Sequence, residues 1–245
     1  MAAEINEALE FVTVFTIPIG PLVIPVNETV IVTWVVMAIL IIASLVLTRN
    51  LREIPRGAQT LLEGAVEFLD NFSKEHFGHR AKTYGPYIGM IFLLLLLANI
   101  IPVLSPLGVS FLGRTYKAPF EIKPPARDIN FSAALACISI LMVLIGGLRA
   151  RGLKGWARKL LSPVPMMLPF NLMEYLIRPT SLCLRLFGNI LGGFIIMRLI
   201  ETVVPLFLPP ILSLYFDFLD GLIQALVFAF LTVLFVAEAV EAESS

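Results

Sequence analysis

The chain has 245 residues, 58% of them hydrophobic, and its 18 basic and 18 acidic side chains give a formal net charge of zero. Its mean hydropathy of +0.90 and its long apolar runs exclude an ordinary soluble domain. The balanced charge offers no support for nucleic-acid binding. Because helices satisfy their own backbone hydrogen bonds in lipid, we expect an all-α integral membrane protein with a single membrane domain, 1–245.

The first half of the chain predicts two membrane helices and one surface helix. Residues 1–26 contain several prolines, which argue against a span. We expect the first span at 29–47, roughly the 20 residues that a bilayer core needs. In 55–76, apolar side chains recur at helical spacing opposite acidic and polar ones, which predicts an amphipathic helix on the membrane surface. The second span is expected at 84–104.

The second half predicts three further membrane helices, at 129–148, 169–201 and 211–238. The connection before the first of them, 105–125, is rich in proline and glycine and suits a loop with a short hairpin. The segment 169–201 would be about 50 Å long at 1.5 Å per residue. It is too long for a perpendicular span, so we expect a helix that tilts or bends, with Pro179 allowing the bend.

Basic residues concentrate in 48–83 and 149–168. Since basic loops stay cytoplasmic, we expect both connections inside, the N-terminal segment outside and the acidic C-terminus inside. The loop 105–128 carries four further basic residues, so the bias is incomplete. No cationic region precedes the first apolar segment, so a cleaved signal peptide is not indicated. The absence of a transit peptide favours a bacterial plasma membrane.

Cysteine and histidine do not form a disulfide or metal pattern. The two cysteines, Cys137 and Cys183, both lie in apolar segments and give no ligand spacing. The only histidines, His76 and His79, share the polar stretch EHFGHR, for which a solvated loop is the simpler interpretation. We expect no cofactor and no metal.

The fourth span contains an arginine, Arg185, with Asn189 one turn later. An arginine at membrane depth costs about 3 kcal/mol on insertion scales, and ionisable residues there are functional by default. We expect a carboxylate on a partner subunit to neutralise this positive charge. The alternative is an internal ion pair with Glu174, Asp217 or Asp220.

Polar side chains also mark the last span, where Asp217, Asp220 and Gln224 recur at helical spacing. Two antiparallel neighbouring helices could place Arg185 and Gln224 opposite each other. The alternatives are that the aspartates lie in the membrane interface and that Gln224 makes a helix-packing hydrogen bond. At the start of the third span, Asp128 suits an N-cap, with a role in ion access as the alternative.

The motif around Arg185, SLCLRLFGNILGG, resembles the signature of subunit a of the membrane sector of F-type ATP synthases, S-L-x-L-R-L-F-G-N followed by small residues. Other segments agree in the same order, over nearly the whole chain from about residue 27. These segments are ANIIP, PPARDINFSAALA, GLKGW, PFNL…RP and IQALVFAFLTVLF.

This resemblance implies a non-catalytic stator subunit, with no nucleotide site, held against a rotating ring of c subunits. Its other partners would be b-type peripheral-stalk subunits and membrane lipids. Protons, or sodium ions in some members, would enter one aqueous half-channel, bind a ring carboxylate and leave by a second half-channel. The essential arginine of the family falls on Arg185. A carboxylate beside an arginine prefers to be ionised, so Arg185 would favour ion release and block a direct leak.

The resemblance also assigns roles to other polar positions. Asn189 and Gln224 match family positions, and Gln224 is the candidate to orient Arg185. The chain departs from the family at Phe194, where many members carry glutamate or histidine, and at Asp217, where many carry histidine or glutamate. The side chains expected to line the half-channels are Asp217, Asp220, Asp128 and Asn130 on the outer side and Glu174 on the cytoplasmic side.

Two other classes of protein compete with this interpretation. A secondary transporter would bind an anionic substrate at Arg185, but transporters usually contain internal repeats and paired broken helices, and the sequence shows no repeat. A membrane enzyme would need a nucleophile and a base, and no such pair is apparent.

Overall fold

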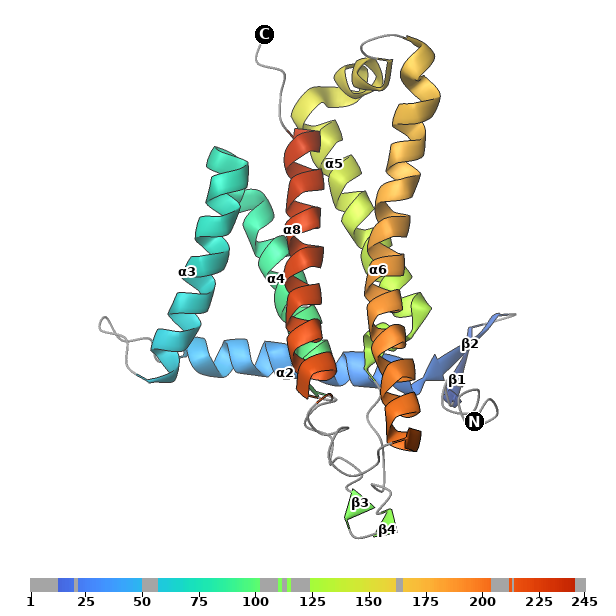
Figure 1. The fold of residues 1–245 in the computed structure, drawn as a ribbon. Coiled ribbons are helices and arrows are strands. Elements are labelled where there is room, and N and C mark those ends of the chain that lie inside the picture. The colour runs from blue at the N-terminus through green and yellow to red at the C-terminus, as the bar shows by residue number, and fades with distance from the viewer. Residues whose placement is uncertain are drawn as a thin grey trace. The chain divides into compact units, whose positions relative to one another are not determined.

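The computed structural model describes residues 13–19, 22–49, 57–101, 110–111, 114–115, 124–161, 165–203, 212 and 214–240. Figure 1 shows its elements in chain order. The main helices are α2 (Glu28–Thr48), α3 (Ala58–Phe77), α4 (Ala81–Ile100), α5 (Ile129–Leu161), α6 (Leu168–Val203) and α8 (Asp220–Val240), with a π-helical segment η5 (Leu214–Leu219) directly before α8. The short 3₁₀ turns are η1 (Gly78–Arg80), η3 (Pro125–Arg127) and η4 (Pro165–Met167). The strands are β1 (Thr13–Ile19), β2 (Leu22–Asn27), β3 (Ser110–Phe111) and β4 (Arg114–Thr115).

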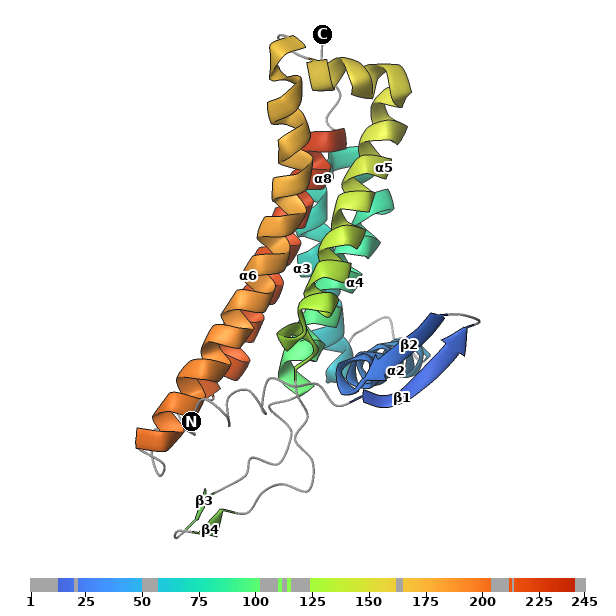
Figure 2. The same cartoon turned by 90° about the vertical axis from the view of Figure 1, so that its right-hand side faces the viewer.

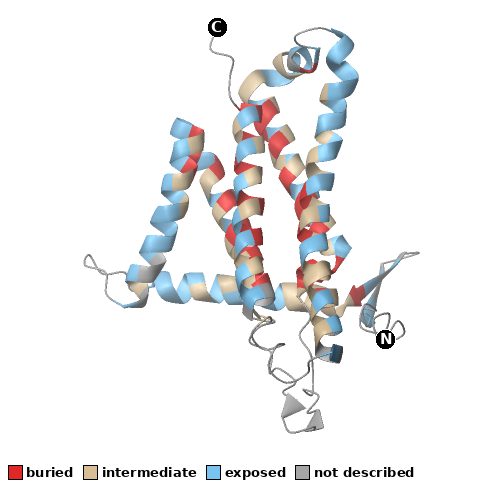
Figure 3. Cartoon of the chain, in the orientation of Figure 1, coloured by how far each residue is buried: buried red, intermediate tan, exposed pale blue. Residues whose placement is uncertain are grey.

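In the part of the chain that the structure describes, five stretches of helix are long and apolar enough to cross a membrane, which confirms the expected all-α membrane fold. They are Glu28–Thr48, Glu63–Ile100, Ile129–Arg158, Pro165–Met197 and Asp220–Val240. Figure 3 shows buried residues along α4, α5 and α8, whereas α2 is mostly exposed and α6 is a mixture of exposed and intermediate residues. Apolar side chains cover these exposed helices, as a lipid or protein environment requires.

The N-terminal segment, where the prolines argued against a span, contains a hairpin that the sequence analysis did not predict. Strands β1 and β2 form an antiparallel hairpin. Their sequences, TVFTIPI and LVIPVN, are rich in β-branched residues on either side of Gly20 and Pro21, which is a strand–turn–strand signal. Prolines are tolerated because both strands of a two-stranded sheet are edges. The short hairpin expected after the second span is also present, as β3 and β4.

Helix α5 extends well beyond the expected end of the third span at 148. The basic connection was expected as a loop, but the chain stays helical on both sides of Gly152, whose φ of 70° and ψ of 170° interrupt the helix. Only glycine adopts such a positive φ at little cost. The chain turns at the upper end of α5 in Figure 2, and the short helical segment after the turn reaches α6. There Trp156 Nε1 donates to the Tyr175 hydroxyl at 3.2 Å.

The chain forms two compact units, and α4, α5, α6 and α8 each contribute to both. The first unit comprises Met1–Asn50, Leu93–Phe131 and Phe187–Ala225, and the second comprises Leu51–Phe92, Ser132–Leu186 and Leu226–Ser245. In the second unit, glycines allow close helix packing. A Cβ at Gly146 would lie 3.0 Å from Val240 Cγ2, and one at Gly147 would lie 3.7 Å from Ala239 Cβ. The last turn of α8 is therefore fixed tightly against α5.

Candidate functional site

Two polar side chains join helices α6 and α8 in the first unit. Asn189 Nδ2 donates to Gln224 Oε1 at 2.9 Å. Gln224 is only 1% exposed, and its Nε2 has no hydrogen-bond partner among the described residues. The hydrogen bond that Gln224 accepts from Asn189 therefore joins two helices, which is the kind of contact that the helix-packing alternative describes.

Helix α4 contacts α8 through Asn99, which the sequence analysis did not name as a site residue. Asn99 is 4% exposed, and its Nδ2 donates to the Gly221 carbonyl at 3.3 Å. Its Oδ1 lacks a partner among the described residues. The sequence could have indicated Asn99, because it is a polar residue inside an apolar span and burying such a side chain in lipid costs free energy. Asn99 and Gln224 are therefore buried polar side chains with contacts to neighbouring helices, and the Asn189 side chain that bonds Gln224 is exposed.

Asp128 lies at the start of α5 and acts as its N-cap. Its Oδ1 accepts from the Asn130 backbone N–H at 2.9 Å and from Asn130 Nδ2 at 3.0 Å. Its Oδ2 accepts from the Thr29 hydroxyl at 2.9 Å, which connects α5 to the first turn of α2. With both oxygens engaged and 4% exposure, the carboxylate anchors a helix start near the positive end of the helix dipole.

Phe194, where the family motif usually has a titratable side chain, lies beside a cation. The Arg127 guanidinium carbon is 3.9 Å from the centroid of the Phe194 ring, within the range of a cation–π contact. Arg127 is 3% exposed. In the first unit, the aromatic ring at this position therefore packs against a buried cation from η3.

Arg185 lies on α6 in the second unit and is half-buried. Within the described residues of that unit, it makes no ion pair or hydrogen bond. A groove along one face of α6 ends at this side chain. Its other lining residues are Leu176, Ile177, Thr180, Ser181 and Leu184. The structure thus presents a cation at the edge of an exposed, mainly apolar helix face.

Glu174 was a possible internal partner of Arg185, but the structure pairs it with Arg178. The Arg178 guanidinium donates to Glu174 one turn before it on α6 and to Glu238 on α8. This ion-pair network lies wholly within the second unit.

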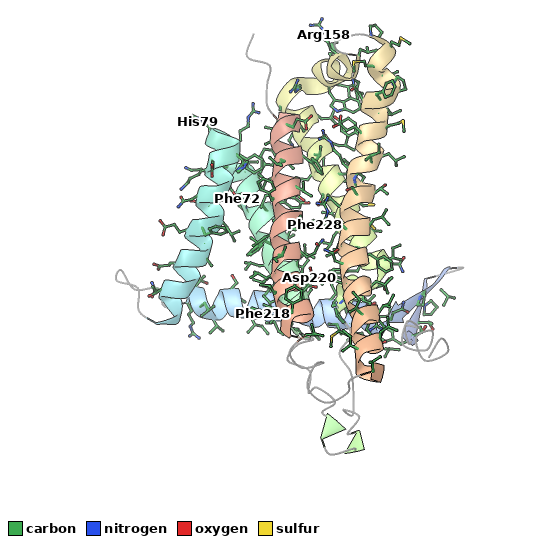
Figure 4. All side chains as sticks on the ribbon, in the orientation of Figure 1. Phe72, His79, Arg158, Phe218, Asp220 and Phe228 are labelled. Carbon is green, nitrogen blue, oxygen red and sulfur yellow. The ribbon has the colours of Figure 1, made fainter. Side chains whose placement is uncertain are left out.

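The acidic residues before Gln224 occupy different backbone geometries. Asp220, labelled in Figure 4, is half-buried at the first position of α8. Asp217 lies within the π-helical η5, and its side chain lies outside what the structure describes. Asp220 and Gln224 lie four residues apart in α8, which is the spacing of one helix face.

Among the described residues, five helical stretches are long and apolar enough to cross a membrane. Together with the amide contacts between helices and the cation on an exposed helix face, they define a polytopic membrane subunit with polar groups on its apolar helices. The family model described as ATP synthase A chain matches residues 30–237, so the chain belongs to this family. Members are non-catalytic, ion-translocating stator subunits of the ATP synthase membrane sector, which confirms the predicted role. This membership decides against the secondary transporter and the membrane enzyme.

Two curated relatives match over most of their length. The chain is 36% identical over 220 residues to ATP synthase subunit a of Moorella thermoacetica, covering 89% of this chain and 92% of the relative. It is 34% identical over 212 residues to the protein named ATP synthase subunit a, sodium ion specific, of Propionigenium modestum, covering 86% of this chain and 73% of the relative.

Proposed function

We propose that Arg185 separates two aqueous half-channels and meets each carboxylate of a rotating c-subunit ring as it passes. The observation that carries this proposal is the exposed α6 face that ends at Arg185, a cation without a partner among the described residues of its own unit. A desolvated guanidinium needs an anion. A carboxylate supplied by a moving partner fits this need, because it arrives and leaves without any change in this chain.

The electrostatics of the encounter explain ion release. A carboxylate in lipid prefers to be neutral, so it carries its proton or sodium ion around the ring. Beside Arg185 the ionised form is favoured, and the ion leaves. The same fixed positive charge repels free cations, so it blocks a direct leak. Each charge that crosses supplies about 2.3 kcal/mol per 100 mV, which rotation passes to ATP synthesis in a separate catalytic head.

The half-channels are assigned from the polar groups at the ends of these helices. On the outer side we assign Asp217 and Asp220 as the titratable groups, with Asp128 and Asn130 as fixed polar lining. On the cytoplasmic side we assign Glu174, which is 52% exposed. We assign Asn189, one turn after Arg185 in the sequence, and its hydrogen-bond acceptor Gln224 as further polar groups of the path.

The remaining assignments follow from family membership and from charge. The chain is a multi-pass protein of a bacterial plasma membrane, with the first turn of α2 outside and the last turn of α8 in the cytoplasm. Its partners are the c ring against α6, b-type stalk subunits and lipid. The ion is a proton or sodium, and the sodium dependence of pumping distinguishes the two.

Cross-linking tests whether the α6 face meets the ring. In a background without the native Cys137 and Cys183, Leu184→Cys on the α6 groove should form a cross-link to a small, very hydrophobic, ring-forming subunit of the purified complex. Leu141→Cys is the matched control, since Leu141 on α5 is about as exposed, 53% against 56% for Leu184. Equal cross-linking at both positions, or none at Leu184, would contradict the proposal.

The outer half-channel predicts an effect of Asp217→Asn. This change removes the titratable group on η5 while keeping its size, so we expect ATP synthesis under an applied ion gradient to fall by about 100-fold, the low end for loss of a proton-transfer group. Synthesis rates in vesicles, normalised to the amount of assembled complex, measure this. A rate equal to that of the parent would remove Asp217 from the path.

A further inference from the structure

Arg178 is the centre of an ion-pair network that joins α6 to the end of α8. Its guanidinium Nη2 donates to Glu174 Oε1 and, at 2.6 Å, to Glu238 Oε2. Its Cζ lies 4.8 Å from the centroid of the Phe235 ring. Only 11% of the Arg178 side chain is exposed, whereas the carboxylates are 52% and 51% exposed. A nearly buried cation is therefore held by two anions and one aromatic face.

The network lies where the backbone of α6 is weakest. Pro179 follows Arg178 directly, and because proline has no N–H, the Tyr175 carbonyl loses its partner in the helix. One residue further, the Thr180 hydroxyl donates to the Leu176 carbonyl at 2.8 Å, a contact that often bends helices. The turn 175–180 is therefore the point at which α6 bends most easily.

The other end of the network is firmly anchored. Glu238 lies in the last turn of α8, next to the residues that pack closely on α5. The Val240 carbonyl also accepts a hydrogen bond from the Arg80 guanidinium. Arg178 thus connects a weak turn of α6 to a well-fixed helix end.

Arg185 follows Arg178 by seven residues on the same helix, and a spacing of seven places two side chains on nearly the same helix face. Any bend at 175–180 therefore moves Arg185 relative to α8. We propose that the ion-pair network of Arg178, Glu174 and Glu238 is a positioning clamp. It holds α6 in one conformation and so fixes the position of Arg185 when a ring carboxylate passes. This inference rests on the function proposed above.

The geometry distinguishes this clamp from an ordinary surface ion pair. Lys74 and Asp70 on α3 also form an i,i+4 pair, with the side chains 58% and 51% exposed. Such exposed pairs contribute little. Arg178 is largely withdrawn from water and bonded across two helices, so its loss removes the cation that the two carboxylates share.

The test measures ions pumped per ATP hydrolysed in sealed vesicles that contain the whole complex. In vesicles that contain only fully assembled complex, this ratio does not depend on how much complex is present, so a role in assembly alone would not change it. We expect Arg178→Gln to lower the ratio by about tenfold, because misplacing a reacting group by about 1 Å can cost 100-fold. Arg178→Lys should retain about half of the parental ratio, because lysine keeps the positive charge but lacks the planar guanidinium with its fixed set of N–H donors.

A double-mutant cycle identifies Glu238 as the partner. We expect Glu238→Gln to lower the ratio by about threefold and the double variant with Arg178→Gln to be no worse than Arg178→Gln alone, as for two residues acting as one unit. Lys74→Gln is the matched control and should pump like the parent. A parental ratio in Arg178→Gln, or a double variant whose loss is the product of the two single losses, would overturn the clamp.

Arg185→Ala in the same vesicles separates the two proposals. If Arg185→Ala pumps normally, the function proposed for Arg185 fails. If Arg185→Ala is inactive while Arg178→Gln keeps the parental ratio, only the clamp fails. Should Arg178→Gln not assemble, Arg178→Lys and Glu238→Gln still decide the question, because unchanged ratios in both would overturn it.

Discussion

Replacement of Arg185 by alanine is expected to reduce ATP-driven ion pumping to background. Without the guanidinium, a ring carboxylate beside α6 has no reason to give up its ion, since an ionised carboxylate in apolar surroundings is costly. Pumping is measured as acidification of sealed vesicles that contain the complex, with and without added sodium. The sodium dependence of the parent identifies the ion.

The control for this prediction is Arg185→Lys, which keeps a positive charge as a compact ammonium. It should retain more pumping than alanine and less than the parent. If alanine and the parent pump equally, Arg185 is a structural charge, and the assignment of the ring-facing helix must be revised.

Gly221→Val is expected to prevent the subunit from accumulating in membranes. A Cβ at Gly221 would lie 2.7 Å from Asn99 Cβ, an atom attached directly to the α4 backbone that no rotamer change can move. The helices would have to separate, at an overpacking cost of about 1–3 kcal/mol or more. Separation would also break the bond from Asn99 Nδ2 to the Gly221 carbonyl and leave a buried amide unsatisfied. Immunoblotting of washed membranes measures the amount of subunit.

A second glycine gives the matched control. Gly64 lies inside α3, and a Cβ there would meet nothing within 4 Å. Gly64→Ala should therefore leave the amount of subunit unchanged, with a slight gain from helix propensity. Parental amounts of Gly221→Val would show that α4 and α8 do not approach as closely as this structure has them.

The helical fold could be predicted from hydrophobicity alone because each span is a continuous apolar run, a signal that needs no tertiary information. The ends of the elements were less predictable. Gly152 terminates one helix and begins another within a basic segment that composition alone assigns to a loop. The hairpin of β1 and β2 was missed because its prolines outweighed its β-branched residues.

The candidate site was predicted as a set of polar residues, but its pairings were not. Helical spacing places Asn189 and Gln224 on particular faces, yet it does not give the longitudinal register of two antiparallel helices. That register pairs Gln224 with Asn189. The clamp depends on Glu238, which is 60 residues from Arg178. Only packing brings these two together, so sequence spacing could not reveal the contact.

The central claim is that Arg185 is both the group that releases ions and the barrier between the half-channels. Passive ion flux tests it most directly, in vesicles stripped of the catalytic head and given an imposed membrane potential. For Arg185→Ala, which should not pump, the account predicts passive flux at least equal to that of the parent, because the charge barrier is gone. Loss of passive flux together with pumping would contradict it and would show that Arg185 is needed for ion passage itself.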